Sequence, residues 1–152
     1  MNPHLVLWRH AEAEAGADDL SRTLTARGAK QARKVAAWLA PRLPEGYRIL
    51  TSPAVRAIET ARALGGSARV VGALGPGASG EDVLATAGWP PGRGAVVVVG
   101  HQPSLGRAAS LLLSGRELDW VIRKGAIYWI ERRARGGDPE LLLRAVVEPR
   151  AL

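Results

Sequence analysis

The chain has 152 residues, of which 47% are hydrophobic and 23% charged, and it contains no cysteine. This composition is typical of a soluble globular protein, and it excludes disulfides and thiolate metal sites. No apolar run approaches the roughly 20 residues of a membrane span, and the N-terminus shows no signal-peptide pattern. We therefore expect one cytoplasmic domain over residues 1–152, with no membrane partner.

The net charge of +7 is compatible with anionic partners. The basic residues are spread along the whole chain, however, and the only dense run, residues 132–135, lies in an expected hairpin. No aromatic residues alternate with the basic ones as a stacking platform for bases would require. A nucleic-acid partner is therefore not expected.

The first expected element is a short strand over residues 5–8. Leu5 to Trp8 are apolar without alternation, as in a strand buried on both faces. Arg9 and His10 follow directly. Because ligands of open α/β sheets gather beyond the carboxyl ends of the strands, these two residues are candidates for a site. The plain alternative is a polar pair that only closes a strand.

A helix is expected next, with Thr25 as its N-cap. Its apolar stripe recurs at helical spacing and comprises Ala32, Val35, Ala36, Leu39 and Leu43. A strand over residues 47–50 precedes a second helix.

In this second helix we expect Ser52 to be the N-cap and Pro53 to hold the first helical position. Val55, Ile58 and Ala61 should face the sheet. Arg56 is then free to turn toward the end of the sheet, near a helix N-terminus that favours anions.

The second half continues the alternation of strands and helices. A weak strand over residues 68–71 is followed by a glycine-rich connection (72–80) and a short helix (81–87). The clearest strand, residues 95–99, is wholly apolar and β-branched apart from its first residue, and it leads into His101. A helix over residues 104–113, for which Ser104 is an expected N-cap, and an antiparallel pair of strands (126–131 and 141–147) complete the chain.

This order predicts an α/β fold, a mostly parallel sheet with an antiparallel edge and helices on both faces. Three polar strand endings should then meet at one edge, with Arg9 and His10 on the first, Arg56 on the second and His101 on the third. The third histidine, His4, is expected at a strand edge or on the surface. The three histidines do not have the spacing of a zinc site.

Two histidines and two arginines without metal ligands suit metal-free phosphoryl transfer, which depends on positioning and charge neutralisation. We expect neutral His10 to attack phosphorus, forming a phosphohistidine intermediate that water hydrolyses. Arg9 and Arg56 would bind the phosphoryl oxygens, and His101 would donate a further hydrogen bond as the cation. The arginines should lower the pKa of His10.

The motifs that carry these residues resemble the histidine phosphatase superfamily, which includes the phosphoglycerate mutases. The motifs are Arg9-His10-Ala11, Ser52-Pro53 with Arg56-Ala57 and Glu59-Thr60, Val99-Gly100-His101-Gln102-Pro103, and the stretch from Arg22 to Gly28. The short chain is most similar to the SixA-like phosphohistidine phosphatases. The resemblance implies a phosphoglycerate mutase-like three-layer α/β/α sandwich, His10 as nucleophile, and Arg9, Arg56 and His101 as the phosphate pocket, with no metal or cofactor.

One departure from the family concerns the general acid. Larger members carry a cap and a carboxylate that protonates an ester leaving group. Glu81 is the first candidate here, although a solvated residue in the first turn of a helix is its plain interpretation; Glu12 is the second. A weak acid and an open pocket suit phosphohistidine on a protein.

Three alternatives stay open at this point. The first is a small-molecule phosphomonoesterase on the same fold. The second is a basic module that binds nucleic acid or polyphosphate. The third is a degenerate phosphatase fold kept for protein interaction, against which the intact set of His10, Arg9, Arg56 and His101 argues.

Overall fold

A six-stranded sheet organises the computed structural model, which describes residues 2–90 and 94–152. The strand order is β3-β2-β4-β1-β5-β6. Four strands run parallel, and two longer strands pair antiparallel at the β1 side of the sheet. Their bounds are β1 Pro3–Arg9, β2 Arg48–Thr51, β3 Ala68–Val70, β4 Gly94–Gly100, β5 Ile127–Arg135 and β6 Asp138–Val147. The mostly parallel sheet with an antiparallel edge is confirmed.

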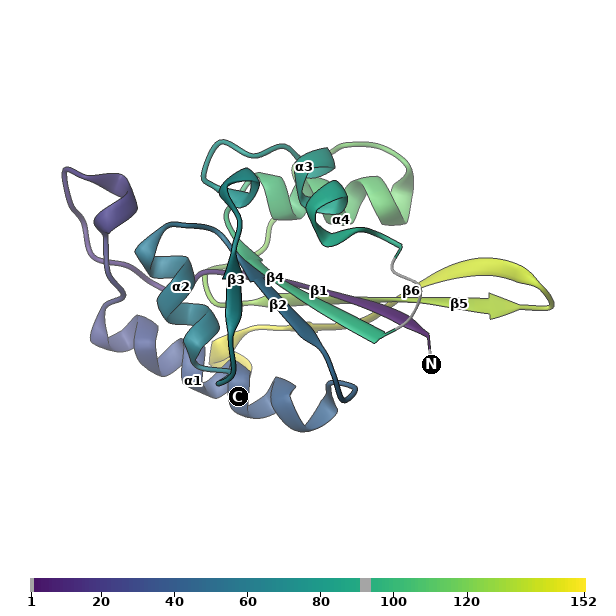
Figure 1. The fold of residues 1–152 in the computed structure, drawn as a ribbon, viewed down its shortest axis with the longest axis horizontal. Helices are drawn as coiled ribbons and strands as arrows, with labels where there is room; N and C mark the ends of the chain where they lie inside the picture. The colour runs from purple at the N-terminus through teal and green to yellow at the C-terminus, as the bar shows by residue number, and fades with distance from the viewer. Residues whose placement is uncertain (1, 91–93) are drawn as a thin grey trace.

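Helices cover both faces of this sheet (Figure 1). On one face lie α1 (Ala26–Leu39) and α2 (Val55–Arg62), and on the other lie α3 (Gly80–Ala87) and α4 (Ser104–Ser114). The β5–β6 hairpin extends beyond the helices at one end of the molecule. The architecture is therefore the expected three-layer α/β/α sandwich.

Strand β1 is buried on both faces, as its uninterrupted apolar run predicts. Val6 and Trp8 pack toward α1 and α2, whereas Leu5 and Leu7 pack toward α3 and α4. Because successive side chains of a strand point to opposite faces, a strand sandwiched between helix layers needs apolar residues at every position. The same holds for the valines of β4.

The capping predictions had different outcomes. Thr25 caps α1, where its side chain accepts a hydrogen bond from the Gly28 amide. The predictions for Ser52 and Ser104 are wrong, because α2 begins at Val55 with Ala54 as N-cap, and Pro103 is the N-cap of α4. The Ser52 hydroxyl accepts from the Ala54 amide and also contacts the His101 ring, and the Ser104 hydroxyl donates to the His101 carbonyl.

The buried face of α2 also differs from the prediction. Val55 and Ile58 are only half-buried, whereas Arg56 and Thr60 are buried. Thr60 turns inward because its hydroxyl donates to the Arg56 carbonyl and accepts a hydrogen bond from the Ala11 amide. Polar contacts at the strand ends thus outweigh apolar spacing in this short helix.

Two further expectations are corrected by the structure. His4 is buried, and the indole Nε1 of Trp129 donates to its Nδ1 at 3.0 Å. The glycine-rich connection is not only a linker, since residues 72–74 form a 3-10 turn that buries Leu74. No helix in the described parts of the chain is long and apolar enough to cross a membrane.

Candidate active site

The ends of three adjacent parallel strands bring the polar motifs together. Strands β2, β4 and β1 are neighbours, and their carboxyl ends lie at one edge of the sheet. The amide of His10 donates to the Gly100 carbonyl, and that of Ser52 to the Val99 carbonyl, each at 3.0 Å. The chain just after each strand is therefore fixed relative to the others, as the predicted convergence requires.

His10 is a buried imidazole with a defined tautomer. Its Nδ1 lies 2.8 Å from the main-chain oxygen of Ala11, and only 7% of the residue is exposed. Because a carbonyl oxygen can only accept, Nδ1 carries the proton and Nε2 carries the lone pair. Burial lowers the pKa of His10 to about 4, with Arg56, Arg9 and Arg22 adding to the effect against the Ala11 hydrogen bond. At neutral pH the ring is a neutral nitrogen base.

His101 faces His10 across the strand ends, with ring centroids 5.2 Å apart. Its Nε2 lies 2.7 Å from the hydroxyl of Ser52, and its Nδ1 lies 3.4 Å from Nη2 of Arg56. Since a guanidinium only donates, Nδ1 is the acceptor and Nε2–H donates to Ser52. The hydroxyl of Ser104 donates to the His101 carbonyl.

In the free protein His101 is neutral, whereas the cation predicted from the sequence belongs to the state with a phosphoryl group bound. Burial lowers the pKa of His101 to about 3, and proximity to His10 and Arg56 contributes. Two imidazoles and two arginines packed together disfavour any additional positive charge. Both histidines are therefore neutral at pH 7.

Arg9 and Arg56 approach the two rings from different elements. Arg9 ends β1, and its Nη1 donates to the Ile122 carbonyl at 3.0 Å. Arg56 lies in the first turn of α2 and is only 4% exposed. The Nε atoms of both are buried and have no hydrogen-bond partner among the described residues, so each guanidinium keeps a donor for an anion.

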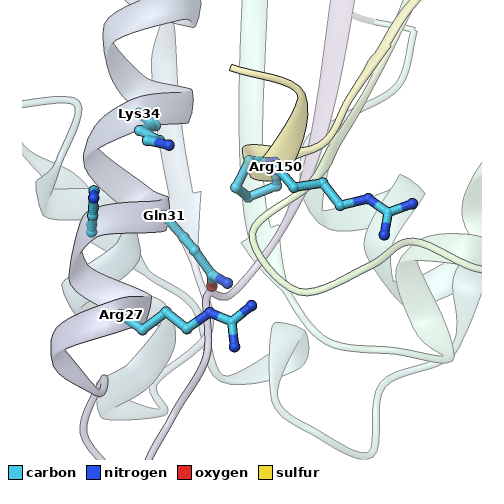
Figure 2. A pocket seen from close by; sticks show the side chains of 6 residues that line it. Arg27, Gln31, Lys34 and Arg150 are labelled. Atoms are coloured by element: carbon cyan, nitrogen blue, oxygen red, sulfur yellow. The ribbon is translucent and has the colours of Figure 1, made fainter.

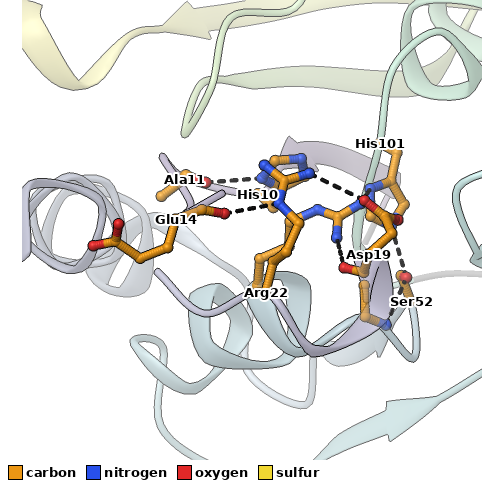
Figure 3. A network of polar contacts seen from close by, with 9 residues as sticks. His10, Ala11, Glu14, Asp19, Arg22, Ser52 and His101 are labelled. Atoms are coloured by element: carbon orange, nitrogen blue, oxygen red, sulfur yellow. Dashed lines mark hydrogen bonds and ion pairs between the residues drawn. The ribbon is translucent and has the colours of Figure 1, made fainter. Parts of the chain in front are cut away.

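Asp19 is part of this site, although no sequence motif indicates a role for it. Its carboxylate accepts from Arg56 Nη2 at 3.1 Å and from Arg22 Nη1 at 3.0 Å, while its main-chain oxygen accepts from Arg56 Nη1 at 2.7 Å (Figure 3). Arg22 also donates to the Glu14 carbonyl. Hydrogen bonds from Arg22 and Arg56 hold the pKa of Asp19 below its usual range. The role of such a polar loop residue becomes visible only in the folded structure, where it contacts a residue that is distant in the sequence.

Among the described residues, neither candidate general acid, Glu81 or Glu12, forms a hydrogen bond with His10 or His101. Glu81 is exposed in the first turn of α3. The Glu12 carboxylate accepts from the Thr25 hydroxyl at 2.9 Å, at the N-terminus of α1. Within residues 2–90 and 94–152, no three histidine, aspartate or glutamate side chains form a group suited to a metal ion.

Comparison with known proteins adds to this geometry. Residues 5–72 match the family model of the histidine phosphatase superfamily, branch 1. This match covers a little less than half of the chain, so it is a similarity to part of the family model. The matched segment includes Arg9, His10 and Arg56, and His101 follows it in the sequence. No curated protein matches the chain by sequence.

Solved structures extend the likeness to a histidine phosphatase over the whole chain. The chain is similar to a phosphohistidine phosphatase assigned as SixA from Nakamurella multipartitia, with 27% identity, a TM-score of 0.76, and coverage of 98% of this chain and 97% of the other. The chain is also similar to a protein histidine phosphatase SixA in complex with tungstate. The identity is 26%, the TM-score is 0.75, and the match covers 97% of this chain and 98% of the other. A protein assigned as SixA from Agrobacterium tumefaciens, at 22% identity, a TM-score of 0.77 and coverage of 98% and 99%, shares the fold. The architecture is phosphoglycerate mutase-like.

Proposed function

We propose that this protein is a metal-independent phosphatase in which His10 accepts the phosphoryl group. The observation that carries the proposal is the hydrogen bond from Nδ1 of His10 to Ala11, which leaves the Nε2 lone pair available. A neutral imidazole held in one tautomer is a competent nucleophile at pH 7. The surrounding cations supply the charge neutralisation that phosphoryl transfer needs.

The proposed cycle has two displacements. Nε2 of His10 attacks phosphorus in line, the bond from phosphorus to the leaving group breaks, and a phosphohistidine forms. A water molecule then attacks phosphorus, the P–Nε2 bond breaks, and inorganic phosphate leaves. Arg9 and Arg56 bind the oxygens in both steps through their free donors.

His101 would act as a donor only when substrate is present. A phosphoryl dianion favours the protonated form of a neighbouring imidazole and so raises its pKa. We expect His101 to take up a proton together with the substrate and to donate from Nδ1, while Ser52 continues to hold Nε2.

We further propose that the substrate is phosphohistidine on a protein. The similar proteins above 25% identity are described as phosphohistidine or protein histidine phosphatases. An imidazole leaves readily, so the reaction depends little on a strong acid. Asp19 is a poor proton donor because its pKa is lowered, and Glu81 is the remaining candidate for esters.

The test compares a phosphohistidine peptide with an unactivated alkyl phosphate, both with EDTA present. We expect turnover of the peptide to exceed that of the ester and to be unaffected by EDTA. The Glu81→Gln variant should keep peptide turnover, and Glu45→Gln, at an exposed position outside the site, serves as its matched control. Faster hydrolysis of the alkyl ester would instead indicate a small-molecule phosphomonoesterase, and loss of activity in EDTA would contradict metal independence.

A further inference from the structure

A basic groove adjoins the candidate active site. It consists of two neighbouring hollows of about 250 and about 320 Å³ between α1, the loop before β5 and the C-terminal 3-10 turn (Pro149–Ala151). We define the basic groove by the cationic residues that line it: Arg27, Lys30, Lys34, Arg123, Lys124 and Arg150. Figure 2 shows Arg27 and Gln31 extending from α1 toward the turn that bears Arg150.

The groove reaches Arg9 of the candidate active site. Arg9 lines the larger hollow, whereas neither His10 nor His101 does. The amide of Gly125 donates to the main-chain oxygens of both Arg9 and His10. These main-chain hydrogen bonds join the groove wall at Arg123 and Lys124 to the end of β1, next to His10.

Most of the positive charge in the groove is not neutralised. Glu148 is the one carboxylate in the lining of these two hollows, and it already pairs with Arg150 at 3.1 Å and Arg123 at 3.4 Å. In the part of the chain that the structure describes, no carboxylate lies within ion-pair distance of Arg27, Lys30 or Lys124. Clustered cations of this kind raise the local concentration of anions.

The dimensions of the groove favour an extended ligand over a single anion. Arg27 and Lys34 are seven residues apart on α1, which corresponds to about 10 Å along the helix. Acidic side chains on alternate residues of an extended peptide are roughly 7 Å apart, so two of them fit within this length. The lining residues include no aromatic ring on which a base could stack, which argues against single-stranded nucleic acid.

We propose that the basic groove binds acidic side chains that flank the phosphorylated histidine of the protein substrate. This inference rests on the proposed function and names the substrate feature that the enzyme selects. Arg9 binds the phosphoryl group, and the groove cations beyond it bind carboxylates of the same chain. Such contacts act mainly on association and selectivity, so the chemical step is unchanged.

The test uses the triple variant Arg27→Gln/Lys30→Gln/Lys124→Gln. Its matched control, Arg69→Gln/Arg116→Gln/Arg135→Gln, removes the same charge from exposed positions outside the groove. Substrates are phosphohistidine peptides flanked by Glu or by Gln, and phosphoramidate. The groove variant should lose roughly tenfold in kcat/KM for the Glu peptide and keep phosphoramidate turnover, whereas the control keeps both. Equal loss for both peptides, or no loss, overturns the proposal.

Binding of the unphosphorylated Glu peptide, followed by fluorescence anisotropy, separates this inference from the proposed function. Binding that weakens with salt and is lost in the groove variant supports the groove even if no phosphohistidine is hydrolysed. Equal binding of the Gln peptide overturns it. Tighter binding of an oligonucleotide that the groove variant abolishes also overturns it, in favour of a nucleic-acid site.

Discussion

Arg56 donates to Asp19 twice, to the main-chain oxygen at 2.7 Å and to the carboxylate at 3.1 Å. The Asp19 carboxylate therefore pairs with the Arg56 guanidinium, which in the proposed mechanism binds the phosphoryl group. Replacing Asp19 by Asn keeps a hydrogen-bond acceptor but removes the competing charge. We expect Asp19→Asn to bind inorganic phosphate or tungstate several-fold more tightly, as measured by inhibition constants.

The matched control for this change is Asp18→Asn. Asp18 accepts from the Ser21 hydroxyl and does not contact Arg56 in the hydrogen bonds of the described residues. Its substitution alters the net charge by the same amount and should leave the inhibition constants within twofold. Weaker phosphate binding in Asp19→Asn would mean that the carboxylate orients Arg56 more than it competes.

The two site histidines should resist protonation well below pH 6.5. The pKa is about 4 for His10 and about 3 for His101, so neither ring takes up a proton between pH 7 and pH 5 in the free protein. The unfolded chain, by contrast, is protonated near pH 6.5. Folding stability is thus full above about pH 6.5 and falls as the pH drops toward these values.

Imidazole ¹⁵N shifts recorded against pH measure this directly. We expect flat shifts for His10 and His101 down to about pH 5, with the free energy of unfolding decreasing over the same range. Addition of tungstate should raise the pKa of His101. Midpoints near 6.5 in the free protein would contradict the neutral pair.

Ser52 is expected to orient the imidazole ring of His101 through the hydrogen bond to its Nε2. Ser52→Ala removes the partner of Nε2, and a lost hydrogen bond of about 1 kcal/mol corresponds to roughly a fivefold loss of kcat/KM. Ser104→Ala is the matched control, because that hydroxyl bonds the main-chain oxygen of His101 and not its ring. Kinetics at equal folded fraction, checked by circular dichroism, distinguish the two. Equal effects of both substitutions would refute a role for the Ser52 contact.

Gly125 is predicted to be essential for the loop that ties the groove to the site. Its φ is +75°, and a Cβ there would lie 2.9 Å from Cγ of Pro149. Left-handed backbone costs an alanine roughly 1 kcal/mol and overpacking adds about 1–3 kcal/mol, so Gly125→Ala should destabilise by about 3 kcal/mol. Gly136 has a φ of +60° and open space around it, so Gly136→Ala should lower the free energy of unfolding only by the backbone penalty of roughly 1 kcal/mol. Denaturant unfolding measures both, and similar losses would contradict the packing argument.

Local sequence rules were sufficient for most of the fold. The apolar run of β1, the stripe of α1 and the valines of β4 each specify an element without help from the rest of the chain, and the alternation of elements specifies the layers. A mostly parallel sheet then predicts that Arg56 and His101 lie at the same edge as the end of β1, whereas the order of the strands comes from the structure.

What the sequence could not reveal depends on contacts between distant segments. Asp19 pairs with Arg56 across 37 residues, and Ser52 meets His101 across 49. No motif or spacing in the sequence around Asp19 or Ser52 indicates which distant residue it contacts. Ser52 and Ser104 fit capping rules locally, yet their hydroxyls serve His101 instead because the strand ends converge there. The charge state of His101 depends equally on burial that only the closed fold creates.

The central claim is that His10 forms a covalent bond to phosphorus, and trapping that bond tests it most directly. The protein is mixed with a labelled phosphohistidine donor, quenched in base within milliseconds, and mapped by mass spectrometry. We predict acid-labile, base-stable phosphate on His10 alone, and none in His10→Ala together with loss of turnover. Phosphate on a different residue, or full hydrolysis by His10→Ala, would contradict the account.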